Sequence, residues 1–203
     1  MTTLSRTLCV FLTLLQPSQY SVGKEKPPSD SHFSILHITI GKDSFQTVQD
    51  KLGPAKKCHA KWHDGVEIVG YADTSEELIF EFGEIGGGDV TALSLSLPSR
   101  TTGCPPSPLS ARASHLATDG GVRLGMTAQE FVSIFGDPDT KTRSGHWKYD
   151  WTLEPKYTEA EKKAAASAGY PVPSDTYLVE ITVEAKFRGG KLIYFYIAKL
   201  EST

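Results

Sequence analysis

Apolar residues recur at helical spacing in two short stretches of the chain, 45–52 and 131–135, and each is followed by a Gly and then a Pro. This spacing predicts two amphipathic helices of about ten residues, which the Gly and Pro end. The apolar positions are Phe45, Val48 and Leu52 in the first helix and Phe131, Ile134 and Phe135 in the second. The capping boxes expected at the helix starts are Asp43 with Gln46 and Thr127 with Glu130.

Alternation of apolar and polar residues predicts antiparallel strands after each helix. The expected strands are 57–63, 66–72, 78–82 and 93–97 after the first helix, and 146–151 and 180–187 after the second. One helix followed by a hairpin-rich stretch, found twice, indicates an α+β fold. We expect two tandem helix-plus-antiparallel-sheet units with both helices on one sheet face.

The two stretches are similar enough to predict an internal repeat. Gly53 and Gly136 lie 83 residues apart, whereas the Gly pairs of the later hairpins, 87–88 and 189–190, lie 102 apart, so the second unit has an insertion of 19 residues. The predicted organisation is a signal peptide at 1–23, a flexible leader at 24–34, unit 1 at 35–97, a Ser/Pro-rich linker at 98–118, and unit 2 at 119–203 with a helical insertion at 152–176.

The last hairpin has two possible registers. A two-residue Gly-Gly loop would place charged residues opposite apolar ones. A three-residue loop at 188–190 instead pairs Ala185 with Ile193, and it sends Tyr194 and Tyr196 to the polar face of the sheet. We therefore expect the three-residue loop.

The N-terminus has the layout of a removable export signal. A mainly apolar run of eight residues, 8–15, follows a single Arg, and small residues precede Lys24, so cleavage after Gly23 is expected. Eight residues are too few to span a bilayer, which takes about 20. No other segment is expected to cross a membrane. The alternative is an N-terminus that is disordered or buried and never removed.

Composition limits the function. The 203 residues carry a formal net charge of −3, with 39% hydrophobic and 22% charged residues, which is ordinary for a globular protein. No basic stripe is present, so nucleic acid is not expected as a partner. The Gly-rich turns lack the following helix and Lys-Ser/Thr pair of a phosphate loop, and we expect no cofactor.

Two cysteines, Cys58 and Cys104, remain once the signal with Cys9 is removed. In an exported chain such a pair indicates one disulfide. The bridge would close a loop of about 46 residues and stabilise the fold by roughly 4 kcal/mol. Two free buried thiols remain the alternative.

The sequence contains no recognisable catalytic or metal-binding set. His59 and His63 would lie roughly 13 Å apart on a strand, too far to share one ion. No Ser lies in a Gly-x-Ser-x-Gly motif. Cys58 beside His59 is the weak candidate for a thiol nucleophile. We therefore expect a protein that is not an enzyme.

Residues 124–151 contain a Gly-Met-Thr helix start, a Phe-Gly-Asp-Pro helix end and a Trp-Lys-Tyr-Asp-Trp strand. This region resembles the SmpA/OmlA family, and two such units in tandem resemble the β-lactamase inhibitory protein family. The resemblance implies helices packed on one face of antiparallel sheet, with two sheets forming a concave binding surface. The long linker and the helical insertion depart from these relatives, and no inhibitor contact residue is carried over.

Aromatic residues supply the candidate binding site. Trp147, Tyr149 and Trp151 alternate and so share one face of a strand, and Tyr194 and Tyr196 share the polar face of another. Trp and Tyr often anchor protein interfaces. The alternative for the Trp residues is that their strand face packs under the helix as core.

These features predict an exported, secreted or periplasmic, non-catalytic binding protein. Its aromatic concave face would bind a protein or a cell-envelope component, and an inhibitor-like role is one form of this function. The first alternative is a hydrolase that uses the groove between the two units, with the helix at 158–168 as a lid. The second is a structural module of a larger assembly.

Overall fold

A computed structural model describes residues 27–59, 66–73, 78–85, 88–97, 105–109, 116–167, 169 and 175–202, with the backbone alone at 73 and 78–85. The expected signal peptide, the residue Cys104 and the residue His63 lie outside this part of the chain. Within it, no helix is both long enough and apolar enough to cross a membrane.

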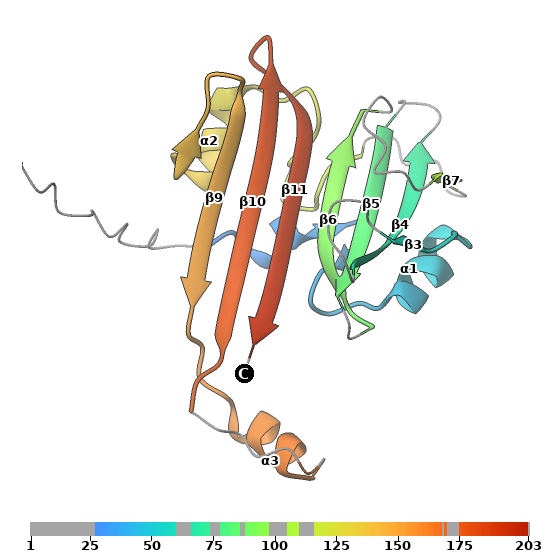
Figure 1. Ribbon diagram of the computed structural model, residues 1–203, viewed down its shortest axis with the longest axis vertical. Coiled ribbons are helices and arrows are strands. Elements are labelled where there is room, and N and C mark those ends of the chain that lie inside the picture. Colours follow the sequence, from blue (N-terminus) through green and yellow to red (C-terminus); the bar gives the residue numbers. More distant parts are fainter. Residues whose placement is uncertain are drawn as a thin grey trace, which may run out of the picture.

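The fold is α+β and is built on one large, mainly antiparallel sheet (Figure 1). Its strand order is β3-β4-β5-β6-β11-β10-β9-β8, and β7 runs parallel to β4. The strands are β3 (Cys58–His59), β4 (Val66–Asp73), β5 (Leu78–Ile85), β6 (Val90–Ser96), β7 (Ser107–Pro108), β8 (Thr140–Lys141), β9 (His146–Leu153), β10 (Leu178–Arg188) and β11 (Lys191–Ser202).

The two units share this sheet because β6 of unit 1 pairs directly with β11 of unit 2. Leu95 lies opposite Phe195, and Leu93 lies opposite Ile197, so apolar residues meet on the same face across the boundary. The expectation of two separate sheets is therefore wrong. Because backbone hydrogen bonds join the units, their sheets form one continuous surface.

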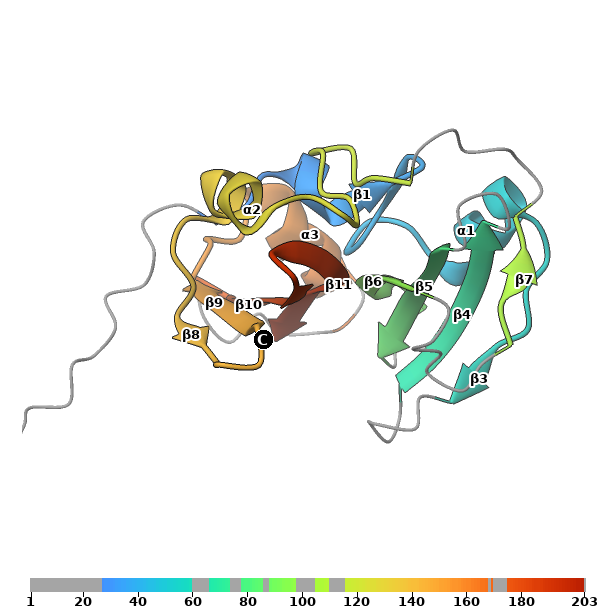
Figure 2. The same cartoon turned by 90° about the horizontal axis from the view of Figure 1, so that it is seen from above.

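Two helices, α1 (Phe45–Leu52) and α2 (Ala128–Phe135), lie on the same face of the sheet (Figure 2). The predicted capping box of α2 is present, with Thr127 and Glu130 each accepting from the backbone N–H of the other. The predicted box of α1 is wrong, because Ser44 caps that helix. Asp43 instead accepts a hydrogen bond from the backbone N–H of Thr39 at 2.7 Å.

Equivalent backbone hydrogen bonds connect the residues just before each helix to the last strand of the same unit. The N–H of Gly41 donates to the carbonyl of Val90 at 2.7 Å, and the N–H of Gly125 donates to the carbonyl of Leu192 at 2.8 Å. Each N-cap residue also forms an isolated β-bridge to the residue just before this acceptor. Ser44 pairs with Asp89, and Thr127 pairs with Lys191. The two units thus have the same local geometry at the helix start.

Phe131 of α2 lies at the centre of the unit 2 core and is fully buried. Its ring lies within 4.6–6.1 Å of four aromatic rings, those of Phe135, Tyr149, Phe187 and Phe195. Phe135 belongs to α2 itself, and the other three partners come from β9, β10 and β11, so one helical residue contacts three adjacent strands. This contact fixes which face of the sheet is core.

The end of the expected leader and the start of unit 1 are packed rather than flexible from Phe33 onward. This segment forms a 3-10 helix, η1 (Asp30–Phe33), and a two-stranded sheet of β1 (Ser34–Ile35) and β2 (Ile38–Thr39). Phe33 is buried, so the expected leader boundary at 34 is too late. The segment also meets the end of the linker, because Ile35 pairs with Thr118.

The insertion contains the predicted helix, α3 (Glu159–Ser167), with the expected Thr158–Glu161 cap. No residue of α3 is buried. The helix lies beyond the end of the sheet (Figure 1) rather than over it, so it is not placed as a lid. A neck of two chain segments connects it to the sheet, where the rings of Tyr157 and Tyr177 lie 4.8 Å apart.

The last hairpin combines features of both registers. Its turn is Gly189–Gly190, and Arg188 pairs with Lys191, so the expected three-residue loop is wrong. A β-bulge after Lys186 then shifts the register, so that Ala185 lies opposite Phe195 rather than Ile193. The extra residue of the bulge restores apolar pairing.

The Cys58–Cys104 disulfide stays a prediction, because Cys104 lies outside the described residues. The strands nearest the two cysteines, β3 and β7, both pair with β4. Cys58 lies opposite Ile68 on β4, and Ser107 lies opposite Tyr71, three residues further along the same strand. Three extended residues span about 10 Å, and Cys104 precedes Ser107 by three residues. The chain therefore has enough length for Cys104 to reach Cys58.

We expect a non-reducing peptide map of the protein, prepared without reductant, to contain one linked pair, Cys58 with Cys104. Replacing both cysteines by serine should lower the free energy of unfolding by about 4 kcal/mol. Urea unfolding of this variant, with reduced wild type as its control, measures the loss. Two alkylated cysteines in unreduced protein would contradict the bridge.

Candidate functional site

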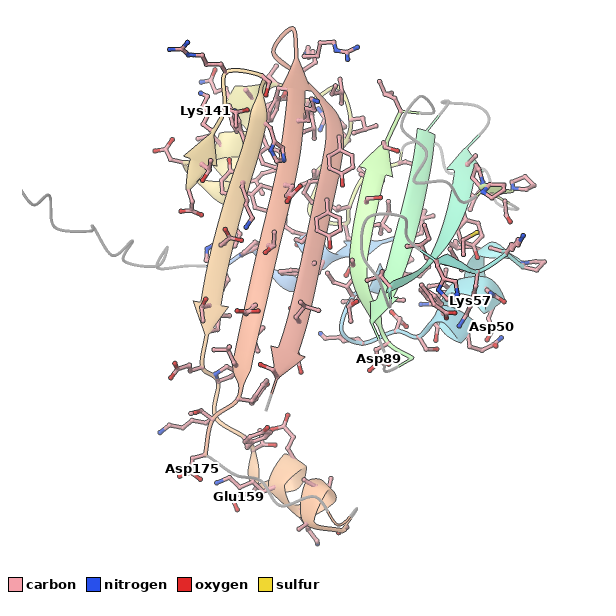
Figure 3. The ribbon with its side chains drawn as sticks, in the orientation of Figure 1. Asp50, Lys57, Asp89, Lys141, Glu159 and Asp175 are labelled. Carbon is pink, nitrogen blue, oxygen red and sulfur yellow. The ribbon has the colours of Figure 1, made fainter. Side chains whose placement is uncertain are left out.

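The face of the sheet opposite α1 and α2, here called the open face, carries most of the polar strand residues. Figure 2 shows that the sheet curves, with its edge strands β8 and β3 bending away from the side on which α1 and α2 lie. Figure 3 shows side chains standing on it along β9, β10 and β11. Over these strands the open face consists of His146, Lys148, Asp150, Thr152, Glu180, Thr182, Glu184, Lys186, Tyr194, Tyr196, Ala198 and Leu200.

The predicted Trp147–Tyr149–Trp151 stripe does not lie on the open face. These side chains are 6%, 0% and 3% exposed, because their side of β9 packs against α2. Trp151 stacks on Tyr149 with centroids 5.9 Å apart, and Trp147 contacts Phe187 at 4.4 Å. Their assignment as partner-binding residues is therefore corrected: they belong to the core.

Tyr194 and Tyr196 do lie on the open face, as predicted, and both are half-buried. Tyr196 lies opposite Glu184 on β10, and Tyr194 lies opposite Lys186. Burial, with a smaller contribution from the carboxylate of Glu184, raises the pKa of Tyr196 to about 12. This phenol therefore keeps its proton and is neutral over the physiological pH range.

Polar pairs on β9 and β10 lie beside the tyrosines of β11, on one side of that strand. His146 Nε2 and Glu184 Oε2 lie 3.2 Å apart. Further along the strands, Lys148 Nζ lies 3.0 Å from Asp150 Oδ2, and the hydroxyl of Thr182 donates to Asp150 Oδ1 at 2.9 Å. The side chains of the His146–Glu184 and Lys148–Asp150 pairs are between about one third and one half exposed, so a partner can reach them.

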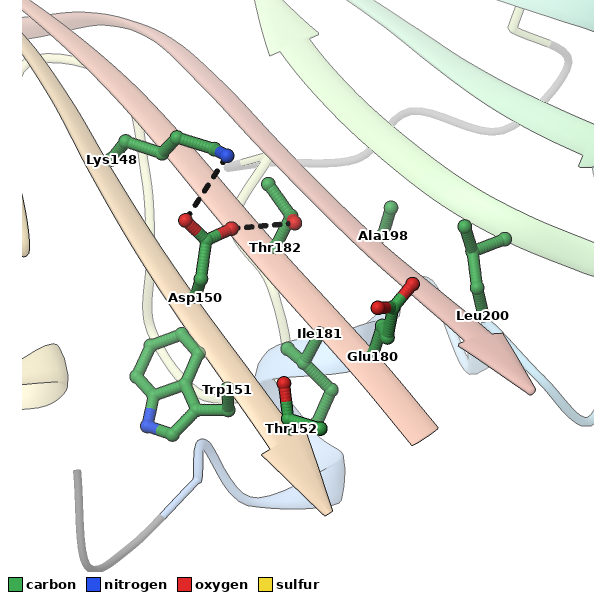
Figure 4. A pocket seen from close by; sticks show the side chains of 9 residues that line it. All are labelled: Lys148, Asp150, Trp151, Thr152, Glu180, Ile181, Thr182, Ala198 and Leu200. Atoms are coloured by element: carbon green, nitrogen blue, oxygen red, sulfur yellow. Dashed lines mark hydrogen bonds and ion pairs between the residues drawn. The ribbon is translucent and has the colours of Figure 1, made fainter. Parts of the chain in front are cut away.

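A pocket of about 290 Å³ opens on this face across β9, β10 and β11 (Figure 4). Its lining includes Lys148 and Asp150 from β9, Glu180 and Thr182 from β10, and Ala198 and Leu200 from β11. Ala198 lies opposite Thr182 and forms a low point between the larger side chains of its own strand. The volume is close to the lower limit of small-molecule sites, about 300 Å³, and suits a single side chain.

Among the described residues, no three His, Cys, Asp or Glu side chains lie close enough together to hold a metal ion. His59 lies in β3 with an exposed side chain, and its expected partner His63 lies outside the described residues. Cys58 is half-buried against Val66 and Ile68.

The comparisons with known proteins are sparse. No protein-family model matches the chain, and no curated protein matches it significantly. A crystal structure of a candidate β-lactamase inhibitor protein from Streptococcus mutans is similar with a TM-score of 0.23 and 12% sequence identity, over 81% of this chain and 90% of that chain. A likeness this weak carries no argument about function, and the SmpA/OmlA resemblance stays a prediction.

Sequence reasoning found the two tyrosines and missed the pocket beside them. The signal was present in β11, where Tyr196, Ala198 and Leu200 alternate on one face and the middle residue is small. The acidic residues of the pocket, Asp150 and Glu180, could not be assigned to it, because that requires the register of β9 against β10.

The raised pKa of Tyr196 makes stability depend on pH in alkali. Between pH 10 and about 12 the unfolded phenol ionises while the folded one keeps its proton, so the free energy of unfolding should fall as pH rises. Urea unfolding across this range should show a shallower fall for Tyr196→Phe than for wild type. Equal slopes for the two proteins would mean that the phenol is not shifted.

Proposed function

We propose that the chain is an exported, non-catalytic binding protein that binds a protein partner with the open face over β9, β10 and β11. The observation that carries the proposal is the pair Tyr194 and Tyr196, half-buried two residues apart on the sheet face that neither α1 nor α2 covers. Tyrosine combines a large apolar ring with a hydroxyl and is enriched among interface hot spots.

The surroundings of the tyrosines favour a protein over a small ligand. The polar pairs His146–Glu184 and Lys148–Asp150 lie on the same face, so charged side chains border the aromatic rings on the side of β9 and β10. Protein interfaces have this arrangement. An inhibitor-like role, in which the partner is an enzyme, is one form of the proposal, and export rests on the N-terminal sequence at 1–23.

The hydrolase alternative depended on a groove between the two units. Because β6 and β11 are hydrogen-bonded neighbours, the boundary between the units is a continuous sheet. The matched hydrogen bonds at the starts of α1 and α2 support a further proposal, that the two units are copies of one ancestral unit.

Affinity capture from secreted and envelope fractions tests the binding proposal. We expect the processed protein to retain a saturable protein partner. The variant Tyr194→Ala/Tyr196→Ala should bind it at least about thirtyfold more weakly, since a single hot-spot residue contributes about 2 kcal/mol. The matched control is Tyr157→Ala/Tyr177→Ala, which removes two half-buried, contacting tyrosines from the neck of α3.

Unfolding midpoints of both double variants are measured first, so that a loss of fold is not read as a loss of binding. Equal affinity for wild type and the Tyr194/Tyr196 variant, or binding lost only in the control, would contradict the proposal. A retained partner that is lipid or polysaccharide would contradict the choice of a protein.

A further inference from the structure

The pocket on the open face has an uncompensated negative charge. Asp150 and Glu180 supply two carboxylates, and Lys148 supplies one ammonium group. Lys148 is already paired with Asp150 at 3.0 Å, so that pair is neutral. Glu180 is exposed and makes no ion pair or hydrogen bond with any residue that the structure describes, which leaves its carboxylate at the mouth of the pocket.

Apolar surface lies directly beside this carboxylate. Leu200 is opposite Glu180 on β11 and is 38% exposed, one of two large apolar side chains exposed in the described part of the chain. The small side chain of Ala198 forms the low point next to it. An occupant must therefore present both an apolar stem and a positive group.

Two protein side chains have that composition. Arginine and lysine bury an alkyl stem along apolar surface while the charged head reaches a polar partner. The planar guanidinium of arginine also matches a carboxylate with two parallel hydrogen bonds. A bare metal ion fits less well, because no three ligating side chains converge in the described residues and the apolar wall would have no role.

We propose that this pocket is the subsite for a basic side chain of the protein partner, with Glu180 pairing with the cation and Ala198 and Leu200 contacting its alkyl stem. The inference rests on the proposed function, since it concerns the same face. It adds what that proposal leaves open: the partner carries an arginine or lysine that projects from its surface toward the start of β10.

The tested probe is N-acetyl-L-arginine amide, added at low salt to ¹⁵N-labelled protein and followed by amide chemical shifts. N-acetyl-L-citrulline amide is the matched neutral probe, because it keeps the shape of the side chain and removes the charge. We expect saturable shifts at Glu180, Thr182 and Leu200 with the arginine probe and none with the citrulline probe.

The variant Glu180→Gln should weaken arginine binding about fivefold, the upper range for a solvent-exposed ion pair. Glu159→Gln, on α3 beyond the end of the sheet (Figure 3), is the matched control and should bind as wild type does. Equal shifts from both probes, or unchanged binding in Glu180→Gln, would overturn the subsite.

Failure of the subsite and failure of the proposed function give different results. If a partner is captured through Tyr194 and Tyr196 but neither the arginine probe nor Glu180→Gln has an effect, the subsite alone is wrong. If the arginine probe binds through Glu180 but the tyrosine variant captures the same proteins as wild type, the subsite stands and the binding proposal for the tyrosines is wrong.

Discussion

The structure depends on the pairing of β6 with β11. Each unit alone would have a short sheet with an unpaired edge, which is a site for uncontrolled association. Pairing of Leu93 with Ile197 and Leu95 with Phe195 removes both edges and aligns the apolar faces of the two units. One sheet face is then core across both units. On the other face the side chains of β9, β10 and β11 include exposed ones, whereas Ile68 of β4 and Ser96 of β6 are buried.

The position of the helices determines which strand side chains are buried and which are left uncovered. Phe131 of α2 contacts rings from three strands, and most side chains on that side of β9, β10 and β11 are buried. The exceptions, Leu153, Lys199 and Glu201, lie at the far end of the strands. Alternation along the strands then places Tyr194, Tyr196 and Glu180 on the other side. The proposed interface is therefore a consequence of core packing, since the residues that reach a partner are those that the helices leave uncovered.

Much of the fold could be predicted from local sequence signals. Helical spacing and Thr127–Glu130 predicted α2, and alternation predicted the strands, because both depend on neighbours in the sequence. The core role of Trp147 and Trp151 could not be decided, since alternation shows that residues share a face but not which face the helix covers. The partner of Ala185 was also missed. A two-residue loop followed by a β-bulge places Tyr194 and Tyr196 on the same face as a three-residue loop does, so the pattern of apolar and polar residues cannot distinguish the two.

The central claim is that a partner docks on the open face, and side-chain footprinting by hydroxyl radicals tests it most directly. The account predicts that Tyr194, Tyr196 and Leu200 lose reactivity when the captured partner binds, while Tyr157 in the neck of α3 keeps its reactivity. Protection confined to α1, α2 or α3, with Tyr194 and Tyr196 unchanged, would contradict it.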